Sequence, residues 1–82
     1  MDIKKGQIVI SKAGHDDGQP FVVVEVKDNY VYLADGKERK LNALKKKNIK
    51  HIAVTNSVVN LPDTDKSLRK LLNSFSRVNQ ED

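Results

Sequence analysis

The chain contains no cysteine, so it can form neither a disulfide framework nor a thiolate metal cage, and a reducing compartment is allowed. It also lacks long apolar runs: FVVV at 21–24 is far shorter than a membrane span. The N-terminal MDIKKGQ has no apolar segment typical of a signal peptide. A chain of 82 residues has room for one small core. We therefore expect one soluble, cytoplasmic domain with no membrane partner.

Recognisable catalytic motifs are absent too. The sequence has no serine in a nucleophile-elbow context, no phosphate-cradling GxxxxGK loop and no carboxylate pair with an evident pocket. Its two histidines, His15 and His51, would have to meet beside a carboxylate to form an iron or zinc site. We expect no enzyme, no cofactor and no metal.

Positive charge is in excess, and it is concentrated in one stretch. The net charge is +4, and residues 1–55 carry eleven basic side chains against seven acidic ones, whereas residues 56–82 carry four of each. Within residues 37–50 seven cations face only Glu38; they are Lys37, Arg39, Lys40, Lys45, Lys46, Lys47 and Lys50. Such a patch favours a polyanionic partner, although surface lysines also serve solubility alone.

Five short runs, bounded by turn residues, predict β-strands. They are QIVIS (7–11), FVVVEVK (21–27), YVYLA (30–34), KERKL (37–41) and IKHIAV (49–54). DN at 28–29 and DG at 35–36 predict the hairpins of a meander, which leaves the lysine run in the loop after the fourth strand. The fifth strand is expected to pair with the first. Five such strands make a small barrel, which we place at residues 1–55.

Alternation along the strands predicts which side chains face the core. Three valines of the second run share the side that we predict to be buried: Val22, Val24 and Val26. The opposite side takes Phe21, Val23, Glu25 and Lys27. In the third run Val31 and Leu33 point inward, and Tyr30 and Tyr32 point outward. The tyrosines can stack on bases or simply stabilise the sheet as a cross-strand pair.

The C-terminal part predicts a helix over residues 63–79. Residues 56–62 have no periodicity and read as a connector, and DTD at 63–65 supplies candidate N-caps and first-turn acids. An apolar stripe follows at helical spacing, made of Leu68, Leu71, Leu72, Phe75 and Val78. An isolated helix of this length is marginally stable. We expect the stripe to pack on the barrel within the same domain, with a partner protein as the alternative.

Residues 6–26, GQIVISKAGHDDGQPFVVVEV, resemble the KOW motif: a glycine, an apolar strand, a loop with a central glycine and a second apolar strand. With LADGKERKL and KKKNIKH following in this order, the chain is similar to short bacterial KOW-domain proteins related to large-subunit ribosomal proteins of eukaryotes and archaea. The match covers roughly residues 5–52; Leu44 stands where the family has a proline, and the helical tail lies outside it.

The resemblance implies an SH3-like barrel that binds RNA, often in or near the ribosome or the transcription–translation machinery. We therefore expect an RNA-binding accessory protein with ribosomal RNA as its main partner. Gly14 and Gly18 allow the loop between the first two strands, which we call the first loop, to approach a phosphate backbone. The lysines supply attraction that is independent of the RNA sequence. The predicted RNA-contacting residues are Lys12, Gly14, His15, Arg39, Lys45, Lys46, Lys47, Asn48, Lys50 and His51, with Tyr30 and Tyr32 as candidate base-stacking residues.

Other interpretations stay open. Asp16 and Asp17 are typical of residues that shape a turn through backbone hydrogen bonds, and His51 is typical of a hydrogen-bonded histidine at a barrel rim. SH3-like barrels also bind proteins, so a module that contacts ribosomal or transcription proteins through a strand edge or the helix is the second hypothesis. A DNA-associated barrel is the third. We expect a monomer, because short, lysine-rich strands disfavour edge association.

Overall fold

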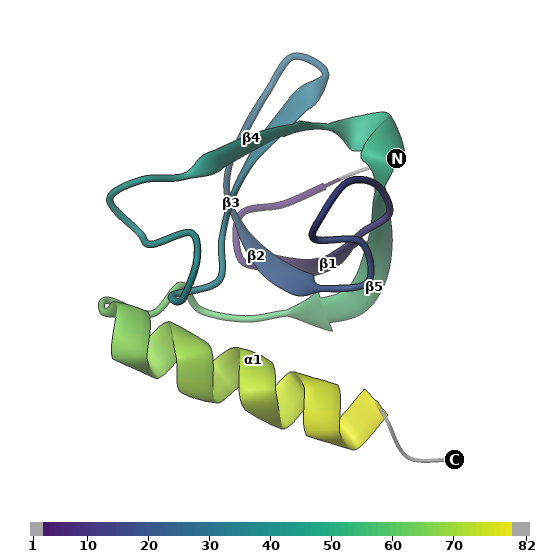
Figure 1. The fold of residues 1–82 in the computed structure, drawn as a ribbon. Coiled ribbons are helices and arrows are strands. Elements are labelled where there is room, and N and C mark those ends of the chain that lie inside the picture. The colour runs from purple at the N-terminus through teal and green to yellow at the C-terminus, as the bar shows by residue number, and fades with distance from the viewer. Residues whose placement is uncertain (1–2, 80–82) are drawn as a thin grey trace.

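The structure is a computed structural model that describes residues 3–79, with side chains described as far as residue 75. The chain is mainly β, with five strands in one antiparallel sheet followed by a helix (Figure 1). The strands are β1 (Gln7–Ser11), β2 (Pro20–Lys27), β3 (Tyr30–Ala34), β4 (Lys45–Asn48) and β5 (Ile52–Val58). A short 3₁₀ turn, η1 (Ile49–His51), joins β4 to β5, and the helix is α1 (Asp65–Asn79). The predicted mainly-β class with a C-terminal helix is confirmed.

The strand order in the sheet is β4-β3-β2-β1-β5. The first and last strands pair as expected, with Val9 opposite Val54 and Ser11 opposite Ile52. The sheet is strongly curled, and η1 leads the chain from one edge strand round to the other (Figure 1). Within residues 3–79 no ladder joins β4 to β5, so the sheet is open.

The fourth strand is not where the DG signal predicts it. Residues 37–41 lie in a loop, and the strand is formed instead by Lys45–Asn48. The loop closes on itself, because one carboxylate oxygen of Asp35 accepts hydrogen bonds from the backbone amides of Lys37 (2.9 Å) and Arg39 (2.8 Å). The prediction was wrong because these amides are satisfied within the turn and do not join a sheet ladder.

The fifth strand also differs from its prediction. Residues 49–51 form η1, since the side chain of Asn48 accepts a hydrogen bond from the amide of Lys50 (3.0 Å) and caps the turn. The strand then runs to Val58, with a bulge in its ladder to β1. The predicted sheet boundary at residue 55 is therefore too early, and the connector to the helix is residues 59–64.

The sheet buries side chains on both of its faces. The inner cluster contains Val9, Phe21, Val23, Val31 and Leu33, and the outer cluster contains Ile8, Val22, Ala34, Leu68 and Leu72. The inward direction of Val31 and Leu33 is as predicted. The predicted sides of the second strand are wrong: Phe21 and Val23 pack in the inner cluster, whereas Val22 is in the outer one. The common face predicted for three valines is also wrong for Val26, which packs with the inner cluster while Val24 packs with the outer one. A register shift between Val23 and Glu25 reverses the alternation.

The helix provides the second layer and covers part of the outer face of the sheet (Figure 1). Thr64 is its N-cap, since its hydroxyl accepts a hydrogen bond from the amide of Ser67 (3.1 Å). Leu68 and Leu72 are buried against β1 and β2, and each contributes about 1.5–3 kcal/mol by leaving water. The side chain of Val78 lies outside the described residues. In the described part of the chain, no helix has the length and apolar character needed to cross a membrane.

Candidate nucleic-acid interface

The three consecutive lysines at 45–47 lie on a strand, so their side chains alternate between the two faces of the sheet. Lys45 pairs with Leu33 and Lys47 with Val31, which places both lysines on the inner face. Lys46 pairs with Tyr32 and lies on the outer face. The sequence prediction placed these lysines together in one loop patch. The structure divides their charges between two different surroundings.

The two inner lysines converge on one carboxylate of the loop between β1 and β2. The ammonium of Lys47 lies 3.0 Å from one oxygen of Asp16, and the ammonium of Lys45 lies 3.3 Å from the other. The hydroxyl of Ser11 donates a hydrogen bond of 2.7 Å to the same carboxylate. The first loop and the lysine run therefore lie close together in space, although an acid on the loop neutralises part of the basic patch.

This arrangement changes the acidity of Asp16. Burial alone raises the pKa of its carboxyl, but the hydrogen bonds from Ser11, Lys47 and Lys45 favour the charged form more strongly. The net effect lowers the pKa from 3.8 to about 2. The side chain of Lys47 is only 9% exposed, and it also donates to the carbonyl of Ala13 at 2.8 Å. The ion pair is thus largely shielded from water, unlike an exposed surface pair.

The first loop is a compact turn, as its sequence suggests. Backbone hydrogen bonds run from the amide of Gly18 to the carbonyl of Ser11 (2.8 Å) and from the amide of Asp17 to the carbonyl of Gly14 (3.2 Å). Gly14 and Gly18 both have positive φ, at 83° and 89°, and both are exposed. His15 is exposed on the same loop. The side chain of Asp16 joins the turn to Ser11, Lys45 and Lys47, and the sequence analysis missed these contacts.

On the outer face, Lys46 and two tyrosines form an exposed surface that we call the Tyr–Lys face, defined by Tyr30, Tyr32 and Lys46. The ammonium of Lys46 lies 4.3 Å from the centroid of the Tyr30 ring, within cation–π distance. Tyr30 is 37% exposed and Tyr32 is half-buried, so the predicted outward direction of Tyr30 is confirmed. Asn48 pairs with Tyr30 in the register, but its side-chain oxygen is engaged in capping η1.

A second group of predicted residues gathers where the first loop begins. The amide of Lys12 donates a hydrogen bond of 2.8 Å to the carbonyl of His51, which joins the start of this loop to η1. Lys12, Lys50 and His51 are all exposed. His51 lies in η1, not in a strand as predicted, and it is exposed. No three histidine or acidic side chains in residues 3–79 could together hold a metal ion.

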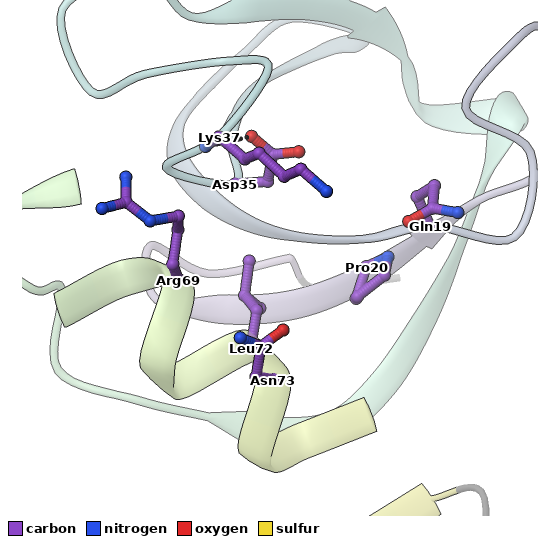
Figure 2. A pocket seen from close by; sticks show the side chains of 7 residues that line it. All are labelled: Gln19, Pro20, Asp35, Lys37, Arg69, Leu72 and Asn73. Atoms are coloured by element: carbon purple, nitrogen blue, oxygen red, sulfur yellow. Dashed lines mark hydrogen bonds between the residues drawn. The ribbon is translucent and has the colours of Figure 1, made fainter. Parts of the chain in front are cut away.

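Two adjoining hollows lie between the first loop, the 35–44 loop and α1. The first, of about 320 Å³, is bordered by helix residues Arg69, Leu72 and Asn73 on one side and by Asp35 and Lys37 on the other (Figure 2). The second, of about 440 Å³, extends past Arg39 to Asp16 and Lys45. Arg39 therefore lies on a different surface from the Tyr–Lys face. The lining mixes acids and bases, so neither hollow is a simple cationic pocket.

Among the residues that sequence reasoning missed, Ser11 and Asp16 matter most. Ser11 ends a strand and Asp16 lies in a turn, and no linear pattern pairs them with lysines about thirty positions later.

A scan against models of known protein families and a search of curated proteins both find no match to this chain.

Proposed function

We propose that the protein is a KOW-type, SH3-like RNA-binding protein whose primary contact surface is the Tyr–Lys face. The observation that carries this proposal is the position of the Lys46 ammonium, 4.3 Å from the ring of the exposed Tyr30, with Tyr32 on the same face. Aromatic rings on a sheet provide platforms for unstacked bases, and a cation beside them attracts the phosphates between those bases. Single-stranded RNA, or unpaired segments of a larger RNA, fits this surface best.

The cations near η1 support the same proposal. Lys50 lies in η1, which follows β4, and Lys12 is linked to His51 through its backbone. An RNA strand that stacks on Tyr30 and Tyr32 has these side chains available to its backbone. Stacking and phosphate contacts tolerate most sequences, so we expect weak base preference. The resemblance to KOW proteins favours ribosomal RNA as the cellular target.

The hypothesis that a partner protein binds the helix has less support. Leu68 and Leu72 are buried in the cluster between helix and sheet, and Leu71 and Phe75 pack against that cluster. A partner could reach this stripe only by displacing the helix from the sheet. The part of the stripe up to residue 75 is therefore accounted for by packing within the molecule.

The experiment compares binding of a single-stranded RNA of about twelve nucleotides by variants with matched charge changes. Lys46→Glu should weaken binding at least tenfold. Tyr30→Ala should weaken it by about 1–3 kcal/mol, the usual loss when one stacking ring is removed. Lys70→Glu makes the same charge change on the exposed side of α1 and should bind within twofold of the natural protein. Fluorescence anisotropy gives the affinities, and circular dichroism verifies the fold.

Natural affinity in both Lys46→Glu and Tyr30→Ala, with the fold intact, would overturn the site. Duplex DNA in a competition assay tests the DNA hypothesis, since it should compete poorly with unpaired RNA. Ultraviolet crosslinking in cells, with sequencing of the attached RNA, would identify the target. A single variant at Lys46 is preferable to replacing Lys45, Lys46 and Lys47 together, because Lys45 and Lys47 hold the first loop through Asp16.

A further inference from the structure

We infer that Ser11, Lys45 and Lys47 form an oxyanion site that the carboxylate of Asp16 fills in the free protein, and that a phosphate group of the bound RNA replaces Asp16 there. We call this site the Asp16 cradle. The choice of RNA as the source of the phosphate rests on the proposed function. The existence of the oxyanion site does not, because it follows from the contacts of these four side chains.

The Asp16 cradle has the donor set that phosphate oxygens require. Two ammonium groups and a hydroxyl converge on the carboxylate at 3.3, 3.0 and 2.7 Å. Charged donors of this kind bind carboxylate and phosphate oxygens alike. If the carboxylate leaves, two neighbouring positive charges remain without a counter-charge in a partly buried place, which is unfavourable until another anion enters. An oxyanion is the chemical class that satisfies the site.

Part of the cradle stays in place without Asp16. The Lys47 ammonium donates a hydrogen bond of 2.8 Å to the carbonyl of Ala13. The Ser11 hydroxyl has a single proton, which it donates to Asp16 at 2.7 Å, so its approach of 3.2 Å to the same carbonyl is the weaker contact. Of the three donors, Lys47 is therefore the one held independently of the carboxylate. A phosphate would meet a partly organised site, which lowers the cost of ordering side chains on binding.

A phosphate can enter only when the first loop displaces Asp16. Gly14 and Gly18 lie two residues before and after it, and glycines with positive φ are suited to absorb changes of backbone direction. The second hollow opens beside Asp16 and Lys45, and Arg39 and Lys37 on its border attract an incoming anion. Asp35 and Glu38 also line it, but the Asp35 carboxylate already accepts two backbone amides. The hollow offers a phosphate an approach from solvent.

The test removes the Asp16 carboxylate and supplies inorganic phosphate in its place. Asp16→Ala should unfold at a lower temperature than the natural protein, and inorganic phosphate at several times its dissociation constant should raise that temperature by about 4–8 °C. Chloride at equal ionic strength should not. Amide NMR shifts on phosphate addition should centre on Ser11, Lys45 and Lys47. Asp17→Ala is the control, because it removes the same charge from an exposed neighbour and should show neither the loss nor the rescue.

The RNA arm measures binding by the same variants. Asp16→Ala should bind single-stranded RNA more tightly than the natural protein, because phosphate no longer competes with the carboxylate. The logarithmic salt slope should be similar in the two proteins, because Lys45 and Lys47 contact phosphate in both complexes. Asp17→Ala should change the affinity little. If Asp16→Ala is too unstable to study, Asp16→Asn removes the charge while keeping a hydrogen-bond partner for Ser11.

The outcomes separate the two proposals. Phosphate that neither stabilises the Asp16 variants nor shifts their cradle amides overturns the oxyanion site, whatever the protein does with RNA. Phosphate rescue together with an RNA affinity that is unchanged in Asp16→Ala keeps the site but overturns RNA as its ligand. If the proposed function is wrong, the natural protein does not bind RNA. The phosphate experiment still tests the oxyanion site in that case.

Discussion

At the residue scale, Asp16 shows how one carboxylate can stabilise a fold while limiting the charge available to a ligand. It joins the first loop to β4 through the side chains of Lys45 and Lys47. Because its side chain is only 17% exposed, the pair keeps more of its energy than an exposed surface ion pair does. The same contact removes two lysines from the exposed basic surface, so Lys46 is the one member of the triplet that faces outward.

The lowered pKa of Asp16 predicts a defined pH dependence of stability. A carboxyl whose pKa falls from 3.8 in the unfolded chain to about 2 in the folded protein stabilises the fold above pH 3.8. That contribution is lost as the pH falls through 2, and the shift corresponds to about 2 kcal/mol. Urea unfolding should therefore show the natural protein about 2 kcal/mol more stable than Asp16→Asn at pH 7, with the difference shrinking toward zero near pH 2. A difference that does not depend on pH would contradict the ion-pair assignment.

At the element scale, the loop of residues 35–44 is attached to α1. Arg69 donates a hydrogen bond of 2.6 Å to the carbonyl of Gly36, and the Asp65 carboxylate accepts one of 2.8 Å from the amide of Leu41. Asp65 therefore acts both as a first-turn acid of the helix and as an acceptor for the loop. These contacts and the buried leucines hold the helix against the 35–44 loop and the sheet.

Close packing at Gly36 predicts a strong effect of one added methyl group. Gly36 has φ of 78°, and a Cβ there would collide with the backbone carbonyl of Asp65. Gly18 has φ of 89°, but a Cβ there would meet open space. Gly18→Ala should cost only the left-handed backbone penalty of about 1–2 kcal/mol, whereas Gly36→Ala should cost more because the loop or helix must also shift. Urea midpoints compare the two variants. Equal losses would argue against the docking of this loop on the helix.

At the scale of the whole molecule, a modest net charge of +4 is distributed so that some cations face solvent and others are paired. Lys12, Lys46 and Lys50 are exposed near the Tyr–Lys face and η1. Lys45 and Lys47 are held inward by Asp16. In the proposed RNA complex, the number of cations that contact RNA depends on whether phosphate displaces Asp16 from the cradle.

Salt dependence measures that number. Three phosphate contacts to a single strand predict a slope of log K against log salt near −2, and five predict about −3.5. We expect the natural protein to approach the steeper value if phosphate displaces Asp16, and the shallower value if only the exposed cations take part. An oligonucleotide with the same bases and an uncharged backbone should bind almost independently of salt. A slope near zero with RNA would contradict electrostatic binding altogether.

Local patterns in the sequence determined much of this protein. Short apolar runs bounded by turn residues predicted the strands at 7–11, 21–27 and 30–34. Alternation along the third of them predicted the directions of Val31, Leu33 and Tyr30, because strand geometry sets which face a side chain takes. Helical spacing likewise predicted a C-terminal helix with an apolar stripe. These features depend on neighbours within a few residues.

Only the tertiary structure decided the position of the fourth strand and the contacts of its lysines. The loop that contains the DG turn at 35–36 closes on itself through the Asp35 carboxylate, and it also packs on a helix about thirty residues away through Arg69 and Asp65. Asp16 likewise meets Lys45 and Lys47 across a similar separation. Ion pairs and hydrogen bonds between distant segments leave no periodic trace in the sequence, because they depend on how the curled sheet brings those segments together.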